Sequence, residues 1–167
     1  IMPGTLTGGS YMTDTAFSHN SNHVVYQQFL ATDTGYYDKI TYFYTGSSGW
    51  HGSVYVAIYD DNQGHPGNVL SYNSHNNGPH HNPQTHNPNH YYHETLGNGV
   101  DLDAGEIYWV AILPERAYGP PDFELAINDD YDYNYGLVQH SHMGFHSNWY
   151  NNPYTYDDGR AFWFMIS

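Results

Sequence analysis

Alternation of apolar and polar positions dominates the chain and predicts short β-strands. In residues 53–59, Val54, Val56 and Ile58 fall on one face of an extended chain, and Tyr55, Ala57 and Tyr59 fall on the other. A period of two residues is typical of a strand. Similar strand patterns recur in the segments 24–30, 38–45, 68–72, 99–103, 106–113, 122–127, 137–145 and 161–166. We find no segment with the periodicity of an amphipathic helix.

The number and spacing of these segments predict an all-β fold. Roughly eight to ten short strands separated by turn residues favour an antiparallel β-sandwich, jelly-roll-like, with long polar loops. Residues 106–113 are apolar on both faces, which is typical of a central, buried strand. Leu and Ile are scarce, so we expect the core to depend on large aromatic side chains, namely Phe29, Phe43, Trp109, Phe162 and Phe164.

Two segments depart from the strand pattern. Residues 1–23 read as an extended N-terminal segment that adds as a strand to a neighbouring subunit, and residues 24–167 as a single sandwich domain. A His-, Asn- and Pro-rich insert fills residues 73–93, and within it residues 73–90 contain almost nothing apolar. We expect turns or polyproline conformation there rather than a strand.

Composition narrows the functional classes. The chain has 167 residues, 17 Asp plus Glu against 3 Lys plus Arg, a formal charge of −14 and no Cys. Three cations cannot form the basic surface that nucleic acid or anionic lipid requires, and no apolar run is long enough to insert in a membrane. Aromatic residues make up 18% of the chain, which argues against disorder despite its polarity.

Four segments together resemble a known type of domain. They are residues 26–29 (YQQF), 40–44 (ITYFY), 54–70, which includes AIYDDNQGHPGNVL, and 100–111 (VDLDAGEIYWVA). This pattern is similar to the choice-of-anchor β-sandwich domains of bacterial surface proteins. The resemblance implies a β-sandwich and an extracellular or cell-surface location, which the scarcity of Lys also favours. It implies no activity, since the molecular role of those domains is mostly undefined.

Acidic and histidine-rich stretches are candidates for metal binding. Asp129, Asp130 and Asp132 lie in one predicted loop, and oxygen ligands on a loop suit Ca²⁺. The pairs Asp60/Asp61 and Asp157/Asp158 mark two further acidic turns. His140 and His142 have strand spacing, which would place both imidazoles on one side as ligands for a transition metal. The competing interpretation is that Asp and Asn form turns and that the His side chains only pack.

Aromatic clusters are candidates for contact with a partner. Tyr and Trp beside Asn and His suit both protein interfaces and stacking on sugars. The candidate contact residues are Trp50, Tyr91, Tyr92, Trp149, Tyr150 and Tyr154. No hydrolase, zinc-protease or nucleotide-binding motif occurs, so we predict no catalytic residues and no enzyme.

Two functions remain open on these grounds. The first is a structural or adhesive extracellular subunit that assembles with copies of itself into a filament, tube or surface layer. The second is a carbohydrate-binding module of a secreted protein, with glycans as partners. The chain contains 13 His, and their protonation would nearly cancel the formal charge of −14. We therefore expect self-association to increase between about pH 7 and pH 5, where histidines ordinarily titrate.

Overall fold

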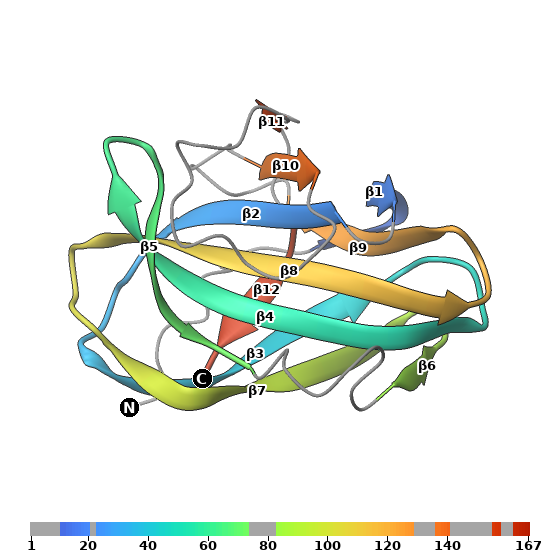
Figure 1. Cartoon of the computed structure of the whole chain (residues 1–167), viewed down its shortest axis with the longest axis horizontal. Coiled ribbons are helices and arrows are strands. Elements are labelled where there is room, and N and C mark those ends of the chain that lie inside the picture. Colours follow the sequence, from blue (N-terminus) through green and yellow to red (C-terminus); the bar gives the residue numbers. More distant parts are fainter. Residues whose placement is uncertain (1–10, 21–22, 74–82, 129–135, 141–154, 158–161) are drawn as a thin grey trace.

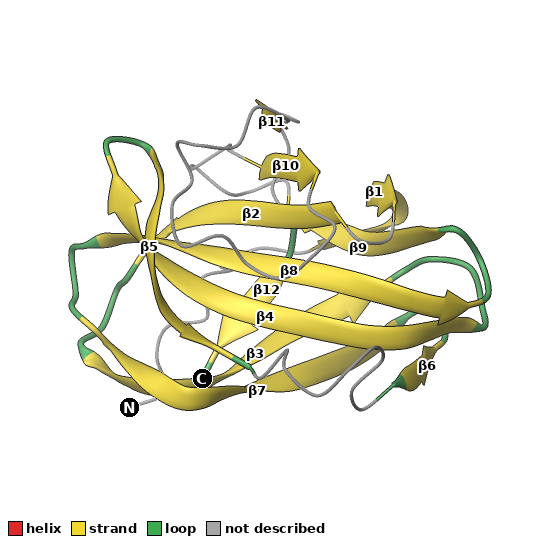
Figure 2. Cartoon of the chain, in the orientation of Figure 1, coloured by secondary structure: helices red, strands yellow, loops and turns green. Residues whose placement is uncertain are grey.

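The structure is a computed structural model, and it describes residues 11–20, 23–73, 83–128, 136–140, 155–157 and 162–167. These ranges form strands joined by loops and contain no helix, hence none that could span a membrane (Figure 2). The strands are β1 (Tyr11–Asn20), β2 (His23–Leu30), β3 (Gly35–Tyr44), β4 (Trp50–Asn62), β5 (His65–Tyr72), β6 (Gln84–His86), β7 (His90–Leu102), β8 (Ile107–Tyr118), β9 (Asp122–Asn128), β10 (Gly136–His140), β11 (Thr155–Asp157) and β12 (Phe164–Ile166).

The predicted all-β antiparallel sandwich is confirmed. One sheet contains β1, β9, β3, β7 and β12, and the other contains β11, β10, β2, β8, β4, β5 and β6 (Figure 1). Antiparallel pairs are nested along the chain: β4 with β5, β3 with β7, β2 with β8 and β1 with β9. Such nesting is a long hairpin rolled into two layers, which is the jelly-roll arrangement.

Large side chains fill the space between the two sheets. Alternate residues of each strand point inward, among them Ile40 and Tyr42 of β3 and Val56 and Ile58 of β4. Three of the five aromatic residues predicted for the core, Phe29, Phe162 and Phe164, are buried in this layer. Burying such a side chain contributes roughly 1.5–3 kcal/mol, so aromatic rings replace the aliphatic core that the composition lacks.

The other two predicted core residues are buried on the outer faces of the sheets instead. Trp109 packs with Tyr26, Tyr55 and Tyr59 on the outer face of the seven-stranded sheet. Phe43 packs with Trp163 on the outer face of the five-stranded sheet. The alternation of side chains along a strand explains the difference: Phe43 follows inward-facing Tyr42 and Trp109 follows inward-facing Tyr108, so both face outward.

The N-terminal segment lies on its own sandwich. Tyr11–Asn20 forms β1 and pairs antiparallel with β9 of the same chain, with a register shift between Met12 and Ala16. The expectation that residues 1–23 add as a strand to a neighbouring subunit stays a prediction, and within the chain β1 is hydrogen-bonded to β9 on one side. Alternating residues such as Tyr11, Thr13 and Thr15 have strand propensity, and the open side of β9 supplies the backbone partners. Residues 1–10 are outside the described ranges.

The polar insert contains strands, contrary to the expectation of turns alone. Gln84–His86 forms β6 on the end of β4, and β7 begins at His90. Between them Asn89 adopts a positive φ of 64°, which Asn tolerates in a tight turn. Burial of His86 among aromatic rings provides the stabilisation that the composition of this segment did not predict.

The β4–β5 hairpin is longer and tighter than its turn residues suggested. Strand β4 continues to Asn62, which pairs with His65, so that Gln63 and Gly64 alone make the turn. Their φ values of 54° and 85° are those of a type I′ turn. Pro66 and Gly67 lie within β5, where the pairing with β4 is irregular.

Candidate functional site

Most of the residues predicted to bind metal or partners lie outside the described ranges. They are Asp129, Asp130, Asp132, His142, Trp149, Tyr150 and Tyr154. His140 ends β10, where the structure describes the strand but not the side chain. The calcium and transition-metal sites therefore stay predictions, which melting curves with and without a chelator would test.

Trp50 is a core residue and not a surface contact. Its side chain is fully buried, and its ring lies 4.8 Å from the ring of Phe123 and 5.0 Å from that of His86. As the first residue of β4 it precedes the half-buried His51, and the alternation of the strand turns the indole inward. The expectation that Trp50 contacts a partner or a glycan is corrected accordingly.

The neighbouring residues Tyr91 and Tyr92 face opposite sides of β7. Tyr92 points toward the core, where its ring lies 4.2 Å from that of His86 and its hydroxyl accepts a hydrogen bond of 2.8 Å from the backbone N–H of Asn87. Tyr91 points outward and is 55% exposed. Tyr91 therefore offers more of its ring to a partner than the half-buried Tyr92 does.

Tyr91 belongs to a group of three aromatic side chains, Phe43, Tyr91 and Trp163, which we call the outer aromatic cluster. Its ring meets Phe43 edge to face at 4.7 Å and Trp163 at 5.3 Å. Phe43 and Trp163 are almost fully buried, and Met165 packs beside them. The cluster comes from β3, β7 and the chain around β12, and it gives the five-stranded sheet an apolar outer patch with one exposed ring.

Strand β7 carries a half-buried carboxyl on its inward side, opposite the outer aromatic cluster. Glu94 pairs with Ile40, whose side chain lies in the core, and so faces inward. Burial raises the pKa of Glu94 to about 7. An inward-facing charged residue on a strand at the side of a sheet is a known obstacle to uncontrolled edge pairing. In the described ranges β3 is the sheet partner of β7.

A buried histidine holds β6 in the core. His86 Nε2 lies 2.8 Å from the hydroxyl of Tyr42, and Nδ1 lies 3.2 Å from the carbonyl oxygen of Gln84. A carbonyl only accepts, so Nδ1 carries the proton and Nε2 accepts from Tyr42. The pKa of His86 is lowered to about 4, chiefly by burial among rings; the hydrogen bond to the Gln84 carbonyl opposes this shift, and nearby His51 adds to it.

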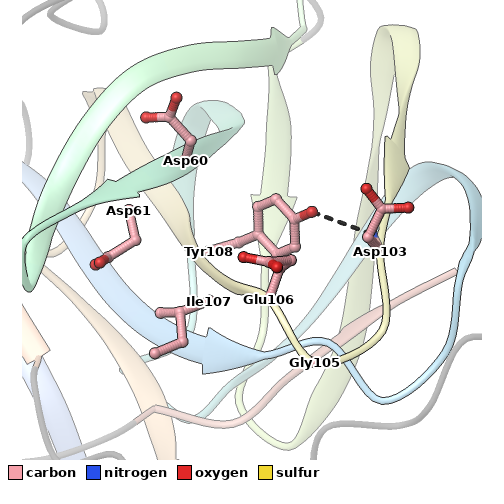
Figure 3. Close-up of a pocket in the computed structure, with 7 residues that line it drawn as sticks. All are labelled: Asp60, Asp61, Asp103, Gly105, Glu106, Ile107 and Tyr108. Atoms are coloured by element: carbon pink, nitrogen blue, oxygen red, sulfur yellow. Dashed lines mark hydrogen bonds between the residues drawn. The ribbon is translucent and has the colours of Figure 1, made fainter.

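A cavity of about 470 Å³ opens at the end of the sandwich where β4 finishes and β8 begins (Figure 3). Four carboxylates line it, two from β4 and two from the turn before β8, around the ring of Tyr108. The lining residues are Asp60, Asp61, Asp103, Gly105, Glu106, Ile107 and Tyr108. The sequence marked Asp60 and Asp61 as an acidic turn, but it gave no sign that residues 103–106 would join them.

The two carboxylates of β4 hold the hairpin together. Asp61 accepts hydrogen bonds from the indole N–H of Trp109 at 2.8 Å, from Gln28 Nε2 at 3.3 Å and from the backbone N–H of Gly64 at 3.2 Å. Asp60 accepts from the backbone N–H of Asn68 at 2.6 Å. These bonds occupy both side chains, whereas Asp103 and Glu106 are exposed at the mouth of the cavity.

No three His, Asp or Glu side chains within the described ranges converge closely enough to hold a metal ion. The cavity therefore offers dispersed negative charge and one aromatic wall rather than a coordination shell. No protein-family model matches the chain, and the search of curated proteins finds no match. The resemblance to choice-of-anchor domains accordingly stays a prediction.

Proposed function

We propose that this protein is a non-enzymatic extracellular structural subunit that assembles with copies of itself into a filament, tube or surface layer. The observation that supports this most is the outer aromatic cluster. Tyr91 is 55% exposed above the buried Phe43 and Trp163, outside the core that already holds the two sheets together. Tyr and Trp rings that are partly exposed on an apolar base are typical of protein interfaces.

The surface charge agrees with assembly by aromatic and polar contacts. The described ranges contain only two cationic side chains, Lys39 and Arg116. Four Tyr side chains are among the exposed large side chains, namely Tyr36, Tyr72, Tyr91 and Tyr118. Rings and hydroxyls are therefore prominent among the exposed groups through which copies of such a chain can meet.

Replacement of Tyr91 tests this function. We expect Tyr91→Ser to raise the concentration needed for assembly at least tenfold, because the ring supplies both apolar area and an edge-to-face contact. Sedimentation velocity and negative-stain microscopy would measure this. Tyr72→Ser is the matched control, because Tyr72 is 45% exposed but lies on β5, away from the cluster. Equal assembly of the wild type and both variants would remove Tyr91 from the interface.

A carbohydrate-binding module is the second candidate, and the same exposed ring favours it. A tyrosine face on a sheet stacks on the apolar face of a sugar, and His93 and Thr95 lie on the same outward side of β7. A glycan array separates the two functions. A chain that stays monomeric and binds a glycan through Tyr91 would replace the assembly proposal, whereas polymers without glycan binding would support it.

A further inference from the structure

The two ends of the sandwich carry different chemistry. Strands β4 and β8 run antiparallel along the long axis of the molecule (Figure 1). At one end Asp60 pairs with Tyr108, and at the other His51 pairs with Tyr118. His51 and Asp60 are nine residues apart on β4, which corresponds to a distance of about 30 Å at the usual rise per residue of a strand. The acidic cavity lies at the first end.

The second end carries a cation and an exposed ring, and we call it the Arg116 end. Arg116 is exposed, and its guanidinium donates a 2.8 Å hydrogen bond to the carbonyl of Gly119, which holds it at the β8–β9 turn. Tyr118 is 60% exposed and stacks on His51 with ring centroids 4.4 Å apart and planes within 8°. His51 is fixed in turn by Thr85 Oγ1 at 2.7 Å.

We propose that copies of this chain join end to end, with the Arg116 end of one copy docked against the acidic cavity of the next. This rests on the proposed self-assembly and adds a second contact to the one at the outer aromatic cluster. Charge complementarity selects a second copy as the occupant. In a chain of formal charge −14, Arg116 is the exposed cation of the described ranges, and it lies at the opposite end from the cavity.

The dimensions of the two ends agree with this contact. A cavity of about 470 Å³ accommodates a guanidinium together with part of a ring, and its exposed carboxylates, Asp103 and Glu106, suit the planar donors of arginine. Tyr108 offers an aromatic wall at the same place. Because each copy carries both ends about 30 Å apart, the contact is head to tail, and its repetition builds a filament unless the rotation between copies closes a ring.

Charge reversal on either end tests the contact. One variant is Arg116→Glu, and the other is the double variant Asp103→Lys with Glu106→Lys. We expect each alone to raise the assembly concentration at least tenfold, because both place like charges across the contact. An equimolar mixture is expected to assemble again, since each variant supplies the complement that the other lacks. Lys39→Glu, with the same charge change elsewhere, should assemble as the wild type does.

Sedimentation velocity gives the outcome, with thermal melting to verify that each variant folds. Rescue by mixing supports the head-to-tail contact. Variants that assemble unaided, or a mixture that does not assemble while the wild type does, overturn it and leave the proposed function intact. If the wild type remains monomeric in sedimentation velocity, the proposed function itself is wrong. A glycan that binds the wild type but not Asp103→Lys/Glu106→Lys, with assembly unchanged, would assign the cavity to a glycan and also overturn the contact. Should Arg116→Glu fail to fold, Arg116→Gln takes its place.

Discussion

Two buried titratable side chains respond to pH in opposite directions. The ring of His86 is fully buried, and this burial lowers its pKa to about 4. The carboxyl of Glu94 faces inward from β7, and burial raises its pKa to about 7. Both shifts favour the neutral form, because a charge in the aromatic interior loses its hydration. Each therefore links the stability of the sandwich to pH, with opposite sign.

Replacement of His86 isolates its part of the acid response. The unfolded chain binds a proton at His86 near pH 6.5 and the folded chain near pH 4, so stability is lost as pH falls between these values. From pH 8 to pH 5 this amounts to about 2 kcal/mol. We expect His86→Gln to lose less stability by about that amount over the same range, measured by urea unfolding. In the wild type, NMR should find the His86 ring neutral at pH 5, and a charged ring there would contradict its placement.

Glu94 makes the folded chain less stable as the pH rises. Its pKa is raised in the folded chain, so its contribution to stability is full below about pH 4.5 and is lost as pH rises through 7. The full shift corresponds to roughly 3 kcal/mol, and partial contact with solvent reduces our expectation to about 2 kcal/mol. Glu94→Gln should therefore be more stable than the wild type at pH 8.5 and similar to it at pH 4.5. If the wild type and Glu94→Gln unfolded at equal urea concentrations at both pH values, the Glu94 carboxyl would be exposed to water, and its raised pKa would be contradicted.

At the scale of elements, the β4–β5 hairpin depends on one carboxylate. Asp61 links the hairpin turn to β2 and β8 through Gly64, Gln28 and Trp109. The side chain of Trp109 is fully buried, so if its acceptor Asp61 is removed, no water replaces it and the indole N–H loses its hydrogen bond. The sequence analysis expected Asp60 and Asp61 only to form an acidic turn.

Removal of this carboxylate should destabilise the sandwich measurably. We expect Asp61→Ala to lower the free energy of unfolding by about 2–4 kcal/mol and to shift Trp fluorescence to the red. Asp103→Ala is the control, because Asp103 is exposed and bonds to Tyr108 through its backbone N–H. We expect that control to change stability by less than about 0.5 kcal/mol. Similar losses in the two variants would contradict the role of Asp61.

The pattern of elements was predictable where alternation was strong. Val54, Val56 and Ile58 were placed on one face of a strand from sequence alone, and that face lies in the core. The sandwich was predicted from such segments. The strands of the polar insert were missed, because His86 is held by rings that come from β3, β4, β7 and β9. The cavity was missed for the same reason, since only the pairing of β4 with β8 brings Asp60 beside residues 103–108.

At the scale of the whole molecule, shape and charge together favour assembly. The nested pairing places β4 and β8 along the long axis, so the acidic cavity and the Arg116 end are separated by the length of the sandwich. The formal charge of −14 opposes close approach of copies near pH 7. Histidines ordinarily gain positive charge in mildly acidic solution, and the chain contains 13 of them, although burial lowers the pKa of His86 to about 4. Assembly should consequently be favoured toward acid pH.

Sedimentation velocity of the purified chain, at a series of pH values from about 7.5 to 5, tests self-assembly most directly, since histidines titrate in this interval. Our account predicts mainly small species at the upper end and large, elongated polymers at the lower end. A single species with the 19.1 kDa mass of one chain at every pH and at high concentration would contradict it.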